Sequence, residues 1–187
     1  MTTRPITQAE HIEIMKTMNE NHSGFFRRNP QVIHILTVEA SVGLRLNDIL
    51  RMQLSDIYMS DKGYRLKITE QKTGKIRNVP FPSELYAYLT EYAMANNRKR
   101  DEPIFTLTVR AVDKYIKKVV DFLELKNVSS HSWRKLYSLN IYEKSGNDTV
   151  AVQQALMHSS LAVTQRYLNR SSEKLENILL SNCNIVK

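Results

Sequence analysis

The sequence has few of the features that mark secreted, membrane or metal-cluster proteins. Its single cysteine, Cys183, excludes an internal disulfide and a metal site built from several cysteines. No apolar run approaches the length of a membrane span, and the N-terminal segment has no apolar core of signal-peptide length. There is also no internal repeat, low-complexity tract or clear interdomain linker. These absences predict a globular protein of a reducing compartment, which we expect to be the cytoplasm.

Positive charge, in contrast, is in excess. Lysine and arginine number 27 against 19 aspartates and glutamates, which gives 187 residues a formal net charge of +8. Such an excess favours a polyanionic partner, because each neutralised phosphate releases counterions. A merely basic surface would have the same composition, so charge alone does not decide between the two. The length suits one domain with its own core.

Hydrophobic periodicity predicts a mainly α-helical protein with one small antiparallel β-sheet between residues 54 and 81. The first helix is expected within residues 6–20, where Thr7 and Glu10 have capping-box spacing. Its core-facing stripe is expected to be Ile12, Ile14, Met15 and Met18. A second, largely apolar helical segment follows at 29–54 and should break or bend near Gly43.

The sheet is expected to contain a strand at 64–69, a turn at Thr73–Gly74 and a return strand ending at Pro80. Pro82 suits the first turn of the next helix, and Asp148 should cap a later one. The remaining helices are expected at 82–97, 108–125, 129–146, 148–157, 160–169 and 172–180.

Arg45 lies where a nearly all-apolar helical segment is interrupted by Gly43, so its side chain should be partly buried. A buried arginine needs a partner. Asp48, three residues later, is the nearest candidate, and this pairing alone would explain both residues. The functional alternative is that Asp48 holds the guanidinium while its other edge faces a phosphate.

Two further segments carry cations in positions that suit a phosphate. Lys72 and Lys75 flank the hairpin turn, where lysines often serve solubility alone, but where one could also give a proton to a leaving oxygen. His131 and Arg134 share a helix face, and the planar fork of arginine suits phosphate. The simpler explanation is that Arg134 pairs with a carboxylate and His131 caps its helix.

The stretch "HSSLAVTQRY" places His158 before a predicted helix and a tyrosine, Tyr167, nine residues later. With nine tyrosines and five histidines in the chain, such a pair can arise by chance. Its significance depends on the cationic segments described above.

Taken in chain order, these segments resemble the tyrosine recombinase (phage integrase) family. "VGLRLNDIL" is similar to the family's first arginine box, and "QKTGKIRNVPF" to its lysine hairpin. "HSWRKLY" is similar to the His-x-x-Arg box, and "LMHSSLAVTQRYL" to the box that joins the last histidine to the nucleophile. The nine-residue step between His158 and Tyr167 matches the family pattern. The resemblance runs from about residue 7 to 170 and implies the fold of the family's catalytic domain.

The resemblance implies a role for each reactive residue. The site would consist of Arg45, Lys72, His131, Arg134, His158 and Tyr167, with Asp48 in support. Tyr167 would attack a DNA phosphodiester to form a 3′-phosphotyrosyl link. The two arginines would bracket the non-bridging oxygens, and Lys72, with Lys75 as the alternative, would protonate the leaving 5′-oxygen. His131 would accept or share the tyrosine's proton, and His158 would hydrogen-bond the phosphate.

This chemistry implies no cofactor, no metal ion and no ATP. Three positions depart from the family pattern. Met157 stands where glycine is usual and Trp133 where leucine is common, and both are expected to be packing positions. Asp48 stands where glutamate is commoner, but the carboxylate is kept. No expected reactive group is missing.

The resemblance also sets expectations for organisation and partners. Residues 1–187 should form one catalytic domain without a separate N-terminal DNA-binding domain, similar in size to the short recombinases that invert fimbrial promoters. A tail helix at about 171–187 would either pack on its own core or be exchanged with a neighbouring subunit. The partner would be double-stranded DNA with a specific recombination site, bound by a homotetramer that is monomeric without DNA, with an accessory DNA-bending protein as a further partner. The cytoplasm would be that of a bacterium or of a phage host.

The cations expected to contact DNA lie on the hairpin and on the helix at 108–125, where they could equally form a solvated face. They are Lys75, Arg77, Arg110, Lys114, Lys117 and Lys118. The resulting function is site-specific recombination, by integration, excision or inversion of a DNA element. The alternatives are relaxation of DNA by a type IB topoisomerase and DNA binding by a non-catalytic regulator on the same scaffold.

Overall fold

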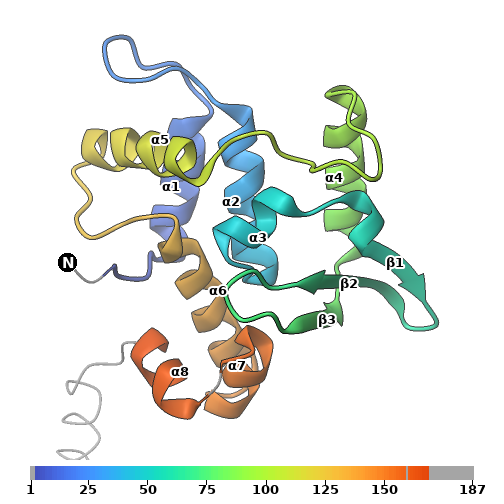
Figure 1. The fold of residues 1–187 in the computed structure, drawn as a ribbon. Helices are drawn as coiled ribbons and strands as arrows, with labels where there is room; N and C mark the ends of the chain where they lie inside the picture. Colours follow the sequence, from blue (N-terminus) through green and yellow to red (C-terminus); the bar gives the residue numbers. More distant parts are fainter. Residues whose placement is uncertain (1–2, 159, 169–187) are drawn as a thin grey trace, which may run out of the picture. The chain divides into compact units, whose positions relative to one another are not determined.

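The computed structural model describes residues 3–158 and 160–168, with the backbone alone for 166–168. By its contacts the chain divides into two compact units, Met1–Tyr137 and Ser138–Lys187. Figure 1 shows that helices predominate and that one small sheet lies in the first unit. The predicted fold class, mainly α with a small antiparallel sheet, is confirmed.

Helix α1 spans Gln8–Met18 and begins at the predicted capping box. The Thr7 side chain accepts a hydrogen bond from the Glu10 backbone N–H, and the Glu10 carboxylate accepts one from the Thr7 backbone N–H. Ile14 and Met18 are buried as predicted. The prediction for Ile12 is wrong, because its side chain is 60% exposed. The buried stripe of α1 is therefore narrower than the apolar residues suggested.

Helix α2, Pro30–Val42, ends at the predicted break. Gly43 has left-handed backbone angles, φ 59° and ψ 28°, and its N–H donates to the carbonyl of Glu39. A Cβ added here would lie 2.2 Å from Cδ1 of Tyr137, so this position needs glycine for both its backbone angles and its lack of a side chain. The chain then turns into helix α3, Leu46–Arg51, with Arg45 as its N-cap residue.

The sheet contains three antiparallel strands in the order β1-β2-β3: Ile57–Ser60, Gly63–Thr69 and Ile76–Pro80. A 3₁₀ turn, Leu54–Asp56, leads into β1. Along β2, Leu66 and Ile68 face the interior while Lys67 and Thr69 face solvent, as the two-residue period of a strand requires. Glu70 continues the same inward row immediately after the strand and is fully buried.

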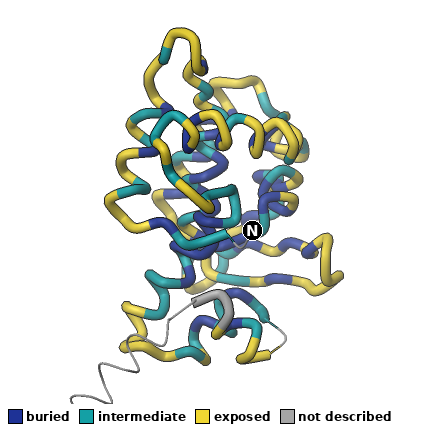
Figure 2. Tube along the Cα trace, turned by 90° about the vertical axis from the view of Figure 1, so that its left-hand side faces the viewer, coloured by how far each residue is buried: buried dark blue, intermediate teal, exposed yellow. Residues whose placement is uncertain are grey.

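Two further helices complete the first unit before α6. Helix α4 spans Ser83–Ala95 and contacts β2; Pro82 is its N-cap residue and not its first helical residue. Helix α5 spans Val109–Phe122 and is capped by Thr108. Figure 2 shows buried positions inside this unit and exposed ones on its loops and outer helix faces. The core-facing residues of α5 are Val112, Ile116, Val119 and Val120.

Helix α6, His131–Lys144, passes from the first unit into the second, which also contains α7, Thr149–Leu156, and α8, Leu161–Leu168. Asp148 caps α7 as predicted, by accepting from the Val150 backbone N–H. Met157 ends α7 in the left-handed region, at φ 53°. Glycine suits this position because of these backbone angles, which is a reason that the expected packing role of Met157 did not include. Trp133 is fully buried and does fill a packing position. The predicted tail helix lies outside the described residues.

Candidate active site

Arg45 projects from the N-terminus of α3 toward the base of the β2–β3 hairpin. Its Nη1 donates to Oε2 of Glu70 over 2.6 Å, and 22% of its side chain is exposed. Within the described part of the chain, its guanidinium makes no second hydrogen bond. One edge of Arg45 is therefore held by protein, and the other remains available to a ligand.

Asp48 does not pair with Arg45, so the predicted ion pair is wrong. Oδ1 of Asp48 accepts from Nη2 of Arg51 over 3.1 Å and from the backbone N–H of Gln71 over 2.9 Å. The reason is geometric: Arg51 follows Asp48 by three residues on the same helix face, whereas Arg45 precedes the helix and reaches the hairpin. Asp48 thus attaches α3 to the first residues of the hairpin turn.

The hairpin turn is fixed at its base and exposed at its tip. The Glu70 N–H donates to the Lys75 carbonyl, and the Gly74 N–H donates to the Glu70 carbonyl, both over 2.9 Å. The Thr73 hydroxyl also donates to Oε2 of Glu70 over 2.9 Å. Lys72 and Lys75 are exposed, as predicted from their places around the turn.

Arg77 does not lie on the surface. Only 1% of its side chain is exposed, and its Nη2 donates to the carbonyl of Val42 over 2.8 Å. Its Nη1 lies 3.7 Å from Oε1 of Glu70. The prediction that Arg77 contacts DNA is therefore corrected. Arg77 pairs with Ile68 across β2 and β3, which places it on the inward face of the hairpin.

His131 and Arg134 share a face of α6, as their spacing predicts. Arg134 is fully buried, and its Nη1 donates to the carbonyl of Gly43. The structure therefore shows a backbone carbonyl among the partners of Arg134, and the carboxylate partner of the simpler explanation stays a prediction. His131 is the first residue of α6 and is half-buried.

The electrostatics of His131 show that the predicted cations gather around it. Burial, followed by the positive charges of Arg134, Lys135, Arg45 and Lys72, lowers its pKa to about 4. The imidazole is therefore neutral at pH 7 and can accept a proton. The pKa of this one ring is thus lowered by cations from three segments that are far apart in the sequence. These cations are Arg45, Lys72 and Arg134.

The last predicted segment lies in the second unit. Nδ1 of His158 is 3.0 Å from the hydroxyl of Thr164 in α8, and the His158 backbone N–H donates to the Gln153 carbonyl over 3.0 Å. Tyr167 belongs to α8, but its side chain lies outside the described part of the structure. The approach of Tyr167 and His158 to the cations of the first unit therefore stays a prediction.

Two buried glutamates were missed by reasoning from the sequence. Glu70 is the partner of Arg45, and it could have been found by extending the inward row of β2 by one step. Glu39 is the only acidic residue of α2, and both its carboxyl oxygens lack a hydrogen-bond partner among the described residues. Burial raises the pKa of Glu39 well above its usual range, although the charge of Arg134 opposes this rise. Burial therefore favours the protonated, uncharged form of the Glu39 carboxyl group.

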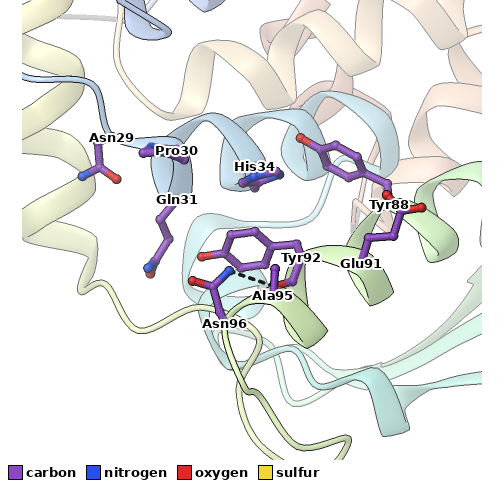
Figure 3. Close-up of a pocket in the computed structure, with 9 residues that line it drawn as sticks. All are labelled: Asn29, Pro30, Gln31, His34, Tyr88, Glu91, Tyr92, Ala95 and Asn96. Atoms are coloured by element: carbon purple, nitrogen blue, oxygen red, sulfur yellow. Dashed lines mark hydrogen bonds between the residues drawn. The ribbon is translucent and has the colours of Figure 1, made fainter. Parts of the chain in front are cut away.

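A separate pocket of about 590 Å³ lies between α2 and α4 (Figure 3). His34 lies between Tyr88 and Tyr92, with ring centroids 4.8 and 4.3 Å away. The side-chain amide of Asn96 donates to the Tyr92 carbonyl, shown as the dashed line. The pocket has no lysine or arginine in its lining and shares no residue with the Arg45 cluster. The chemistry of a phosphate therefore points to the cluster and not to this pocket.

In the part of the chain that the structure describes, no group of three histidine, cysteine, aspartate or glutamate side chains is placed to hold a metal ion. None of the described helices is both long enough and apolar enough to cross a membrane.

Residues 4–174 match the phage integrase family. The chain belongs to this family. It is 27% identical over 176 residues to the "Probable integrase/recombinase YoeC" of Bacillus subtilis (strain 168), with 88% of each chain covered. It is 31% identical over 151 residues to the tyrosine recombinase XerC of Xanthomonas axonopodis pv. citri (strain 306), covering 77% of this chain. Because the match covers 48% of that XerC, the chain spans about half of its length.

Solved structures of the family agree with the fold. The catalytic domain of bacteriophage HP1 integrase superposes with a TM-score of 0.65 at 18% identity, covering 96% of this chain and 95% of that one. The XerH site-specific recombinase in its post-cleavage complex with palindromic difH superposes with a TM-score of 0.72 at 18% identity. The match covers 97% of this chain and 54% of that one. The fold is therefore that of a tyrosine recombinase catalytic domain.

Proposed function

We propose that this protein is a site-specific DNA recombinase that cleaves and rejoins DNA through a 3′-phosphotyrosyl intermediate. The observation that carries the proposal is the group of cations around His131. The charges of Arg45, Lys72 and Arg134 act together on this one imidazole. Membership of the phage integrase family supports the same reaction class.

In the proposed reaction the oxygen of Tyr167 attacks the scissile phosphorus. The bond from phosphorus to the 5′-oxygen breaks, a bond from phosphorus to the tyrosine oxygen forms, and a 5′-hydroxyl leaves. A tyrosine hydroxyl has a pKa of about 10, so it must lose its proton as it attacks. The new ester keeps the energy of the old one, so a second 5′-hydroxyl can reverse the step without ATP.

The residues of the first unit suit the demands of phosphoryl transfer, which are mainly positioning and charge stabilisation. Arg45 offers a free guanidinium edge to one non-bridging oxygen. Arg134 is fully buried in the DNA-free protein and would have to become accessible to bind the other. The neutral ring of His131 can take the proton of Tyr167. Lys72, on an exposed turn, would protonate the leaving 5′-oxygen, with Lys75 as the alternative. His158 would donate to the phosphate, with Thr164 fixing its ring.

The substrate would be double-stranded DNA carrying a specific recombination site. The exposed cations of α5 are proposed to contact its backbone, although Lys117 is also 2.9 Å from Asp121. We further propose one catalytic domain that is monomeric in isolation and assembles as a homotetramer on DNA, with help from an accessory DNA-bending protein. DNA binding should weaken steeply with salt, because phosphate contacts release counterions. The α5 cations are Arg110, Lys114, Lys117 and Lys118.

The decisive experiment is covalent capture. Wild-type protein is incubated with a pool of nicked duplexes whose central segment is randomised, then denatured, and covalent adducts are isolated and sequenced. We expect adducts with the wild type and none with Tyr167→Phe. Tyr58→Phe is the matched control, since it removes an exposed hydroxyl from β1 and should leave adduct formation unchanged. Adducts should also form with EDTA present and without nucleotide.

Other outcomes would select the alternatives. Equal adduct yields from the wild type and from Tyr167→Phe would show that another group is the nucleophile. DNA binding without any adduct would support the non-catalytic regulator. Relaxation of a supercoiled plasmid that lacks any captured sequence would support the topoisomerase.

A further inference from the structure

We infer that Glu70 is a positioning residue of the active site. Glu70 orients Arg45 toward the scissile phosphate and couples Arg45 to the turn that carries Lys72. The inference rests on the proposed function. It begins from the position of the Glu70 carboxylate, which is fully buried immediately after β2. A carboxylate removed from water must be paired and hydrogen-bonded to remain charged.

Oε2 of the carboxylate meets that requirement through groups of the site, whereas Oε1 has an ion-pair partner but no hydrogen-bond partner among the described residues. Arg45 Nη1 and the Thr73 hydroxyl both donate to Oε2, over 2.6 and 2.9 Å, and Nη1 of Arg77 lies 3.7 Å from Oε1. Burial alone would raise the pKa of Glu70, but the hydrogen bonds from Arg45 and Thr73 and the charges of Arg45 and Arg134 outweigh it and lower the pKa. Glu70 is therefore an anion at neutral pH.

Glu70 also closes the hairpin turn with its backbone. Its N–H donates to the Lys75 carbonyl, and its carbonyl accepts from Gly74, so Lys72 lies within a loop whose two ends meet at Glu70. The side chain and the backbone of one residue thus hold the arginine and the lysine loop together. A displacement of the turn would move the carboxylate, and the carboxylate would move Arg45.

The bond to Glu70 uses only one nitrogen of Arg45. The guanidinium is planar and its donors form a rigid fork, so anchoring Nη1 also restricts the direction of the edge that remains free. Asp48 cannot perform this task, because it binds Arg51 and the Gln71 backbone. Lysine in place of Arg45 would lose the fork, and glutamine in place of Glu70 would lose the charge that holds it.

The test compares Glu70→Gln with Glu39→Gln in single-turnover cleavage of a nicked duplex captured by the wild type. Both variants replace a fully buried glutamate in the first unit, but Glu39 makes no hydrogen bond through its carboxyl group to the described residues. We expect Glu70→Gln to bind DNA with nearly wild-type affinity and to form adduct about 10- to 100-fold more slowly. The reason is that a displaced Arg45 would lower the rate of the chemical step without weakening DNA binding. Glu39→Gln should cleave at the wild-type rate.

A double-mutant cycle separates positioning from general loss of structure. If Glu70 acts through Arg45, the variant with both Arg45→Ala and Glu70→Gln should cleave no more slowly than Arg45→Ala alone. Additive losses in the cycle would overturn the inference. If Glu70→Gln does not fold, Glu70→Asp is tested in its place, because it keeps the charge but retracts the carboxylate by one methylene. A folded Glu70→Asp variant that cleaves as fast as the wild type would overturn the inference. A wild type that forms no adduct would instead overturn the proposed function.

Discussion

Replacing Gly43 with alanine should lower the free energy of unfolding of the first unit. The loss should exceed the cost of placing alanine in the left-handed backbone conformation of this position. A non-glycine residue in the left-handed region costs about 1–2 kcal/mol. The new Cβ would also lie 2.2 and 2.5 Å from two carbons of the Tyr137 ring. Overpacking of this kind costs about 1–3 kcal/mol. The expected total is about 2–5 kcal/mol, a large part of the roughly 5–15 kcal/mol stability of a typical domain.

The measurement is urea unfolding followed by the fluorescence of Trp133, the single tryptophan of the chain, which is fully buried on the same helix as Tyr137. Gly24→Ala is the matched control, because Gly24 has φ 81° and nothing within 4 Å of an added Cβ. It should lose only the backbone cost of about 1–2 kcal/mol. If Gly43→Ala loses no more than Gly24→Ala, the contact with Tyr137 does not constrain this position. In a Tyr137→Ala background the excess loss should disappear.

Two further predictions concern stability. Met157→Gly should raise the free energy of unfolding of the second unit by about 1 kcal/mol, because glycine adopts the left-handed backbone angles at φ 53° without strain. An unchanged or lower urea midpoint would contradict this prediction. Glu39 has a raised pKa in the folded state, so its contribution to stability is present in full below pH 4.5 and is lost as the pH rises through the folded pKa. Glu39→Gln should therefore gain thermal stability over the wild type at pH 8 but not at pH 4, and an equal shift at both values would contradict it.

Features governed by local chemistry were the ones that the sequence could predict. The capping box of Thr7 and Glu10, the cap at Asp148 and the helix end at Gly43 each depend on residues within a few positions of one another. The hairpin turn at Thr73–Gly74 is equally local. The spacing of His131 and Arg134 on one helix face likewise follows from helical geometry alone.

The pairing of charges could not be predicted from such signals. Asp48 is the acidic residue nearest to Arg45 in the sequence, yet Glu70 binds Arg45 from 25 positions away. That contact depends on how the hairpin packs beside α3, which no local pattern encodes. Arg77 failed as a predicted DNA contact for a related reason. Arg77 follows the exposed Lys75 by two residues, so it was expected to be exposed as well. Its pairing with the buried Ile68 instead places its side chain on the inward face of the sheet.

A phosphate site must keep like charges together before the phosphate arrives. Here Arg77 donates to the Val42 carbonyl and Arg134 to the Gly43 carbonyl, at the C-terminal end of α2. The carbonyls at a helix C-terminus carry partial negative charge, and this favours nearby cations. Glu70 supplies a full negative charge to Arg45 and lies beside Arg77. These two neutral carbonyls and the Glu70 carboxylate are thus among the groups that hold the three guanidinium groups in the DNA-free protein. Because only Arg45 keeps a substantial exposed surface among the three, we expect it to be the arginine whose environment changes most when DNA binds.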